Sequence, residues 1–169
     1  MFAVGNPTEF VFPIGGQWLL DPNELNGWGI LGPYDNTNSQ DLGNADGLTP
    51  TRFAGGVQFP WDVRLKRFRA DHHNSNATAQ AWGWAIFHMG KTPGTNAVTS
   101  EFILDEVVDN NGVGPRDYSN TTNQLTDISF DDVVVPAGNL VNVSVRSPTA
   151  VGTNYYVRIV SGYLLFERA

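Results

Sequence analysis

Apolar and polar residues alternate along most of this chain, which is the periodicity of a β-strand with one buried face. The segment LVNVSVR at residues 140–146 shows it most clearly, with three valines separated by single polar residues. We expect the valines to face a core and Asn142, Ser144 and Arg146 to face outward. No segment longer than a few residues keeps the spacing of an amphipathic helix. The pattern predicts an all-β fold of about eight to ten strands, as in an antiparallel sandwich or barrel.

The stretch between residues 57 and 69 departs from strict alternation at one point. Four apolar residues share one parity and would share one face: Val57, Phe59, Val63 and Leu65. Phe68 breaks this parity, so we predict a β-bulge at residues 66–68. Further along, the tripeptide PAG at residues 136–138 predicts a turn. The polar segment at residues 35–51 predicts one long exposed loop.

The densest apolar run is AWGWAIFHMG at residues 81–90. On a strand, Trp82, Trp84, Ile86 and His88 project to one side, and small residues dominate the other side. We expect the two tryptophans to lie in the core of the sandwich. The small side would let another sheet or another subunit approach closely. The alternative for the tryptophans, a platform on which a sugar ring stacks, requires exposed rings flanked by polar groups.

Composition supports one all-β domain. Charged residues make up only 16% of the chain, and Lys66 and Lys91 are its only lysines, whereas amphipathic helices carry charged residues on their polar face. The chain has no cysteine, which excludes disulfides and thiolate metal sites. It also shows no secretory leader and no apolar segment long enough to cross a membrane. We therefore expect a protein that is made in a cytosol, stays soluble and binds no membrane.

Net charge bears on the kind of partner. The formal net charge is -7, and a general nucleic-acid binder needs a basic surface for its phosphate contacts. We therefore expect no nucleic-acid partner. One basic cluster stands out: Arg64, Lys66, Arg67 and Arg69. It is interpreted as the wet face of a strand in preference to a site for an acidic partner.

The residues that carry chemistry do not form a catalytic pattern. His72 and His73 fall in a polar turn, and a metal site that joins one of them to His88 across a hairpin is the less favoured interpretation. Two loops rich in aspartate could hold calcium, although neither has the spacing of a calcium-binding loop. Their aspartates are Asp35, Asp41, Asp46, Asp109 and Asp117. No nucleophile motif and no carboxylate pair is recognisable, so we predict a protein that is not an enzyme and has no cofactor.

The C-terminal part of the chain resembles a known group of domains. The PAG turn leads into a valine-rich strand, and residues 161–165, SGYLL, lie in the last strand. This arrangement resembles the closing strands of tumour-necrosis-factor-like and complement-globular-domain-like jelly rolls. Residues 63–87 are similar to a strand–turn–strand of the same sandwiches in bacteriophage virion proteins. The resemblance covers about the last two-thirds of the chain and implies a single jelly-roll domain over residues 1–169. The N-terminal segment departs from the pattern, and we interpret residues 1–9 as an N-terminal arm.

The resemblance also implies an oligomer, because such jelly rolls usually form trimers around an axis lined by aromatic and aliphatic side chains. We predict a homotrimer whose interface includes large rings of the C-terminal strands. These residues are Tyr155, Tyr156, Tyr163 and Phe166. The alternative is that the same rings complete the core and rim of the monomer.

The function that the resemblance implies is structural. We expect a bacteriophage virion protein, either a capsid decoration (cement) protein or a head-fibre or spike protein, made in the host cytoplasm. Its partners would be other virion proteins such as the major capsid protein. One alternative is a carbohydrate- or host-receptor-binding module of a tail fibre, with Trp28, Tyr34 or Tyr118 as exposed stacking rings. A less favoured alternative is a polysaccharide hydrolase, which needs two carboxylates beside a cleft.

Overall fold

The computed structural model describes residues 2–3, 8–20, 28–29, 56–74, 80–94, 98–106, 116–118, 124–146 and 155–169. In this part of the chain every regular element is a β-strand, which confirms the all-β prediction. The strands are β1 (Phe2–Ala3), β2 (Glu9–Leu20), β3 (Trp28–Gly29), β4 (Val57–Gln58), β5 (Val63–Asn74), β6 (Gln80–Lys91), β7 (Val98–Asp105), β8 (Arg116–Tyr118), β9 (Gln124–Val135), β10 (Leu140–Arg146) and β11 (Tyr155–Arg168). Among them, β1, β3, β4 and β8 are only two or three residues long.

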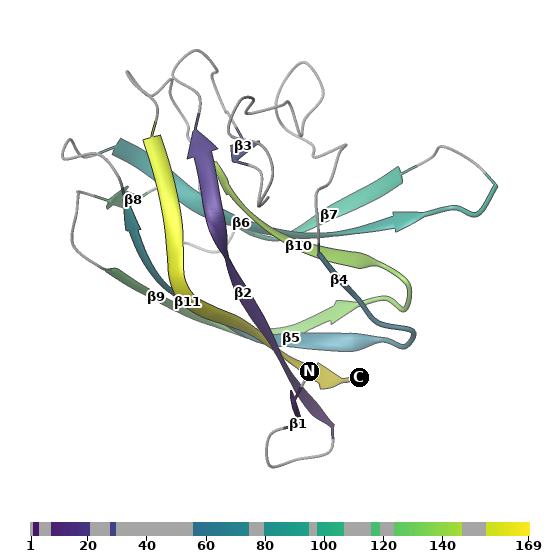
Figure 1. Ribbon diagram of the computed structural model, residues 1–169. Helices are drawn as coiled ribbons and strands as arrows, with labels where there is room; N and C mark the ends of the chain where they lie inside the picture. The colour runs from purple at the N-terminus through teal and green to yellow at the C-terminus, as the bar shows by residue number, and fades with distance from the viewer. Residues whose placement is uncertain are drawn as a thin grey trace.

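These strands form two antiparallel sheets that pack face to face as a sandwich (Figure 1). Sheet A has the strand order β1–β2–β11–β5–β9. Sheet B has the order β3–β10–β6–β7, with β4 paired to β10 and β8 paired to β6. Of the two architectures that the sequence pattern allowed, the sandwich is confirmed.

The main strand pairs are nested in the sequence. β2 pairs with β11, β3 with β10, β5 with β9, and β6 with β7. The chain therefore has the connectivity of one long hairpin, and its successive strand pairs alternate between sheet A and sheet B. The pairing of β11 with β5 and of β10 with β6 joins these pairs within each sheet.

Large aromatic side chains fill the space between the sheets. Trp82 and Trp84 have no exposed surface, and their ring centroids lie 5.2 Å apart in an edge-to-face contact. Phe68 of β5 reaches Trp84 from the opposite sheet, with ring centroids 5.1 Å apart. Such contacts contribute about 0.5–1.5 kcal/mol each beyond the burial of apolar area. The prediction that the two tryptophans belong to the core is confirmed.

Sheet B is buried on both sides along β6. Every residue from 82 to 89 is buried, including Phe87, which points away from the tryptophans. On β10 the three valines are buried as expected, but Asn142 and Ser144 are only 5% and 1% exposed. The expectation that these two polar residues meet water is therefore wrong. Alternation determines which face a residue occupies, but it does not determine whether that face meets solvent.

The β-bulge predicted at residues 66–68 is present in β5. The strand register shifts against both neighbouring strands between Leu65 and Arg67. Opposite β11, Lys66 is the extra residue, because Leu65 and Arg67 pair with consecutive residues of that strand. A bulge reverses the parity of the residues that follow it. Leu65 and Phe68 therefore both reach the core, and neither has any exposed surface.

The region around the histidine pair differs from its sequence prediction. Strand β5 continues to Asn74, so His72 and His73 lie in a strand instead of a polar turn. The side chain of His72 is fully buried. In the predicted N-terminal arm, residues 2–3 pair with residues 10–11 of β2.

The turn predicted at residues 136–138 is confirmed. The backbone nitrogen of Asn139 donates a hydrogen bond to the carbonyl of Pro136 across 3.1 Å. Gly138 has a φ of 79°, in the left-handed region that favours glycine. The long loop predicted at residues 35–51 lies outside the residues that the structure describes.

Candidate functional site

The outward side of sheet A consists of side chains arranged in cross-strand rows. One row follows β2, β11, β5 and β9 through Pro13, Tyr163, Arg69 and Asp127. The next row follows the same strands through Val11, Leu165, Arg67 and Ser129. Directly opposed residues of antiparallel strands point to the same side of the sheet. These eight residues are called the sheet A face below, and all of them are exposed or half-buried.

The sheet A face has an apolar half and a polar half. Strands β2 and β11 contribute the apolar half, which consists of Val11, Pro13, Tyr163 and Leu165. Strands β5 and β9 contribute the polar half, which consists of Arg67, Arg69, Asp127 and Ser129. The division follows the strand boundary between β11 and β5 along both rows.

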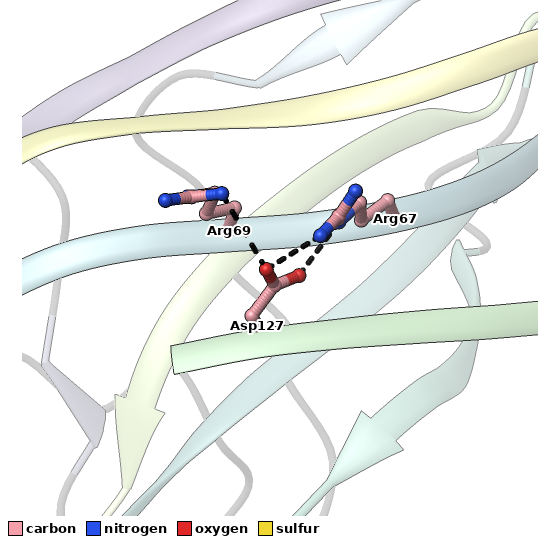
Figure 2. Close-up of polar contacts among 3 residues, drawn as sticks. All are labelled: Arg67, Arg69 and Asp127. Carbon is pink, nitrogen blue, oxygen red and sulfur yellow. Dashed lines mark hydrogen bonds and ion pairs between the residues drawn. The ribbon is translucent and has the colours of Figure 1, made fainter. Parts of the chain in front are cut away.

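The polar half is organised around the carboxylate of Asp127 (Figure 2). Arg67 donates two parallel hydrogen bonds to it, from Nε to Oδ1 and from Nη2 to Oδ2, each 2.6 Å long. Nη1 of Arg69 lies 3.6 Å from Oδ2 of the same carboxylate. The hydrogen bonds from Arg67 hold the pKa of the Asp127 carboxyl below its ordinary value, and they raise the pKa of the Arg67 guanidinium. This two-pronged geometry fixes the orientation of both side chains.

The other two cations of the basic cluster also face carboxylates. Nε of Arg64 lies 3.5 Å from Oδ1 of Asp132, and Nζ of Lys66 lies 4.0 Å from Oε2 of Glu167. Four cations thus face three carboxylates, because Asp127 serves both Arg67 and Arg69. The cluster is the ion-paired wet face of a strand, which agrees with the favoured sequence interpretation.

Further apolar side chains of sheet A meet solvent. On the described surface, the large apolar residues with the greatest exposure are Leu125 and Val134 of β9 and Val160 of β11, at 54%, 43% and 57%. Val160 follows the buried Ile159 and lies where the register of β11 against β5 shifts, between Ile159 and Ser161. In the middle of sheet B the outward side chains are buried instead, namely Ala85, Phe87 and Met89 of β6 and Asn142 and Ser144 of β10. Apolar surface is therefore available to a partner on sheet A.

A cluster of polar side chains of types that often take part in catalysis or ligand binding lies on the inner side of the sheets. Oγ1 of Thr126 lies 3.1 Å from Nε2 of His72 and accepts a hydrogen bond of 3.1 Å from Nε1 of Trp84. The backbone nitrogen of Trp84 donates to Oε2 of Glu106 across 2.8 Å. His72, Thr126 and Glu106 have no exposed surface. Because solvent does not reach these atoms, we interpret the group as a hydrogen-bond network that joins the two sheets.

The four predicted interface residues do not share one surface. Tyr163 lies in the apolar half of the sheet A face. Phe166 has no exposed surface, and its ring centroid lies 4.9 Å from that of Phe59 in the core. It therefore has no side-chain surface to offer another subunit. The sequence alone indicates that Tyr163 and Phe166 face opposite ways, because residues three positions apart on a regular strand point to opposite faces. The side chains of Tyr155 and Tyr156 lie outside the described part of β11.

The residues predicted for ligands are only partly described. Within the described ranges, no group of three or more His, Asp or Glu residues is placed to hold a metal ion. Asp117 of the second aspartate-rich loop lies in β8. The rest of the two aspartate-rich loops and the side chains of Trp28, Tyr34 and Tyr118 lie outside those ranges. Calcium binding and glycan binding therefore stay the less favoured alternatives to a structural role without a cofactor. The described residues also include no helix long and apolar enough to span a membrane.

Several residues of the sheet A face were not singled out from the sequence. Val11, Pro13 and Leu165 occupy ordinary strand positions, and Asp127 is one of many aspartates. The pairing of β2, β11, β5 and β9 brings them together. Comparison of the chain with protein-family models, with curated proteins and with solved structures gives no match. The sheet A face is therefore interpreted from its own geometry.

Proposed function

We propose that this chain is a non-enzymatic structural protein of a bacteriophage virion that assembles as a homotrimer through the sheet A face. In this proposal it acts as a capsid decoration protein or as a head-fibre or spike protein. The observation that carries the proposal is the apolar half of the sheet A face, which lies at the surface of a single chain. The chain would be made in the host cytoplasm and would bind the major capsid protein in the virion.

The chemistry of the sheet A face suits an interface between protein subunits. Burial of apolar area stabilises association by about 25 cal/mol per Å², and contiguous apolar surface on a monomer commonly marks an interaction site. Tyr163 adds a rigid ring, a residue type enriched in interfaces. The fixed charges of Arg67, Arg69 and Asp127 beside it would select one orientation of the partner.

We also propose that the sandwich is a jelly roll, the fold that the resemblance implies, and two observations support this. The nested pairing of β2 with β11, β3 with β10, β5 with β9 and β6 with β7 is what a long hairpin rolled into two sheets produces. The second observation concerns the segments that carry the resemblance, which lie in the last strands of the described chain. The PAG turn connects β9 to β10, and residues 161–165 lie in β11.

The proposal is tested first by the mass of the protein in solution. Light scattering is expected to give about three times the chain mass of 18.5 kDa. Leu165→Asp places a charge in the apolar half and should yield monomers. Thr92→Asp is the control, because Thr92 is exposed directly after β6 of sheet B and lies outside the sheet A face, and this variant should stay trimeric. A wild-type monomer, or equal masses for the two variants, would contradict the proposed interface.

The virion part of the proposal needs a separate experiment. Purified protein is added to phage particles that lack it, and binding is measured by co-sedimentation. Saturable binding that stabilises the particles against heat is expected. Retention on a glycan array without binding to particles would favour the carbohydrate-binding alternative and would overturn the structural one.

A further inference from the structure

One end of the sandwich is closed by the turn between β9 and β10, at residues 136–139. The backbone nitrogen of Gly138 donates to the carbonyl of Phe59 across 2.8 Å, and that of Ala137 donates to Oδ1 of Asp62 across 2.7 Å. The side-chain amide of Gln58 also donates to the carbonyl of Gly138. These contacts hold the turn against the segment that connects β4 to β5.

The same turn is tied to β6 by a contact between Asn139 and His88. Nδ2 of Asn139 lies 2.9 Å from Nδ1 of His88, and the His88 residue is 7% exposed. An amide nitrogen is a donor only, so Nδ1 accepts this hydrogen bond and carries no proton. Gly90 makes room for the contact, because a Cβ at this position would lie 2.7 Å from Oδ1 of Asn139.

The charged surroundings of His88 are simple within the described residues. Oε2 of Glu101, on the paired strand β7, lies 3.6 Å from Nε2 of His88. The turn itself carries no charged residue between positions 136 and 139, and Asp62 behind it accepts from Ala137. Burial lowers the pKa of the His88 imidazole, and the carboxylate of Glu101 opposes this effect only in part.

We propose that His88 is an acid-operated latch that holds the 136–139 turn onto β6. In neutral solution the unprotonated Nδ1 accepts the hydrogen bond from Asn139. When acid adds a proton at Nδ1, that proton faces the amide protons of Asn139, so two donors oppose each other. The Asn139 side chain must then rotate, and the turn loses the side-chain hydrogen bond that ties it to His88 of β6.

The latch is independent of the proposed trimer, because its contacts lie within one chain. It makes the end of the sandwich at residues 136–139 the first part to loosen as the pH falls. The strands that pack around Trp84 do not depend on His88 and should stay folded at the same pH.

The test is an NMR titration of the whole protein from about pH 8 to about pH 4. The midpoint of the His88 ring is expected below about 6.5, the ordinary value. At that same midpoint, exchange of the Gly138 amide proton should accelerate about tenfold or more, while amides in the centre of β5 keep their protection. Titration of His88 without faster exchange at Gly138 would overturn the proposal, as would equal acceleration in β5.

Three variants separate the latch from a general effect of pH. His88→Gln should abolish the acid-induced acceleration at Gly138, whereas His73→Gln, the matched change on β5, should leave it intact. Because His88→Gln also perturbs the core, Asn139→Asp supplies an independent check. Its carboxylate favours the protonated ring, so the His88 midpoint should move to higher pH. An unchanged or lower midpoint in Asn139→Asp would contradict the inferred contact.

Discussion

The indole nitrogen of Trp84 on β6 donates a hydrogen bond to the hydroxyl oxygen of Thr126 on β9, 3.1 Å away. This bond crosses the core, because β6 belongs to sheet B and β9 to sheet A. His72 on β5 lies 3.1 Å from the same hydroxyl oxygen. The buried hydroxyl group of Thr126 thus links three strands, β5, β6 and β9.

Replacing Thr126 with valine keeps the shape of the side chain and removes this acceptor. A lost buried hydrogen-bond partner costs about 1–3 kcal/mol, so we expect Thr126→Val to lower the free energy of unfolding by that amount. Chemical denaturation measures it. Thr126→Ser is the control, since it retains the hydroxyl and loses only a methyl group. A valine variant as stable as the wild type would show that the network does not join the sheets.

Phe166 and Tyr163 should respond to alanine substitution in different ways. Phe166 is fully buried against Phe59, so Phe166→Ala should lower stability by about 3–5 kcal/mol. Tyr163 faces outward, so Tyr163→Ala should weaken self-association and change the stability of the chain much less. Thermal unfolding and light scattering of both variants measure the two effects. The reverse pattern would place Phe166, and not Tyr163, at the interface.

The ion pair between Arg67 and Asp127 should give a stability difference that depends on pH. The pKa of Asp127 is lower in the folded protein than its ordinary value of 3.8. The pair therefore stabilises the fold at pH values above 3.8, and this contribution is lost as the pH falls through the lowered pKa. We expect Asp127→Asn to be less stable than wild type at neutral pH and to match it in strong acid.

Denaturation at several pH values, repeated in high salt, measures this difference. The effect should be small because the pair is exposed and screened by water. Asp131→Asn, which changes an exposed carboxylate of the same strand, is the control. An Asp127→Asn difference that persists unchanged in strong acid would contradict the role given to the ion pair.

Gly162 should not tolerate a side chain. A Cβ at this position would lie 2.8 Å from the backbone oxygen of Arg69, closer than real contacts allow, and a strand backbone cannot turn aside as a side chain can. We expect Gly162→Ala to lower the free energy of unfolding by about 1–3 kcal/mol. Gly15→Ala is the control, since nothing lies within 4 Å of its Cβ position. Equal stability of the two variants would show that β11 and β5 can separate at little cost.

Local alternation was sufficient to predict the burial of the β10 valines, the core position of Trp82 and Trp84, and the bulge at Lys66. These features depend on which side of a strand a residue takes, and the sequence reports that directly. The burial of Asn142 was not predictable in this way, because it depends on whether the second side of sheet B meets water.

The candidate site was less accessible to sequence analysis than the fold. Tyr163 was among the predicted interface residues, but its neighbours in the sheet A face come from segments far apart in the chain. Pro13 and Arg69 both oppose Tyr163, and alternation within one strand carries no information about which strand lies next to it. The same limit applies to His72, whose partner Thr126 is 54 residues away.

The place of β11 between β2 and β5 affects how this protein can be synthesised and refolded. A nascent chain that ends before residue 155 can form the β6–β7 hairpin, but its β2 and β5 have no strand to bridge them. The edges of both strands then stay open to pairing with other chains. Closure of the sandwich requires contacts between distant segments, which makes the final step slow. Aggregation during expression should therefore be governed by how quickly β11 inserts.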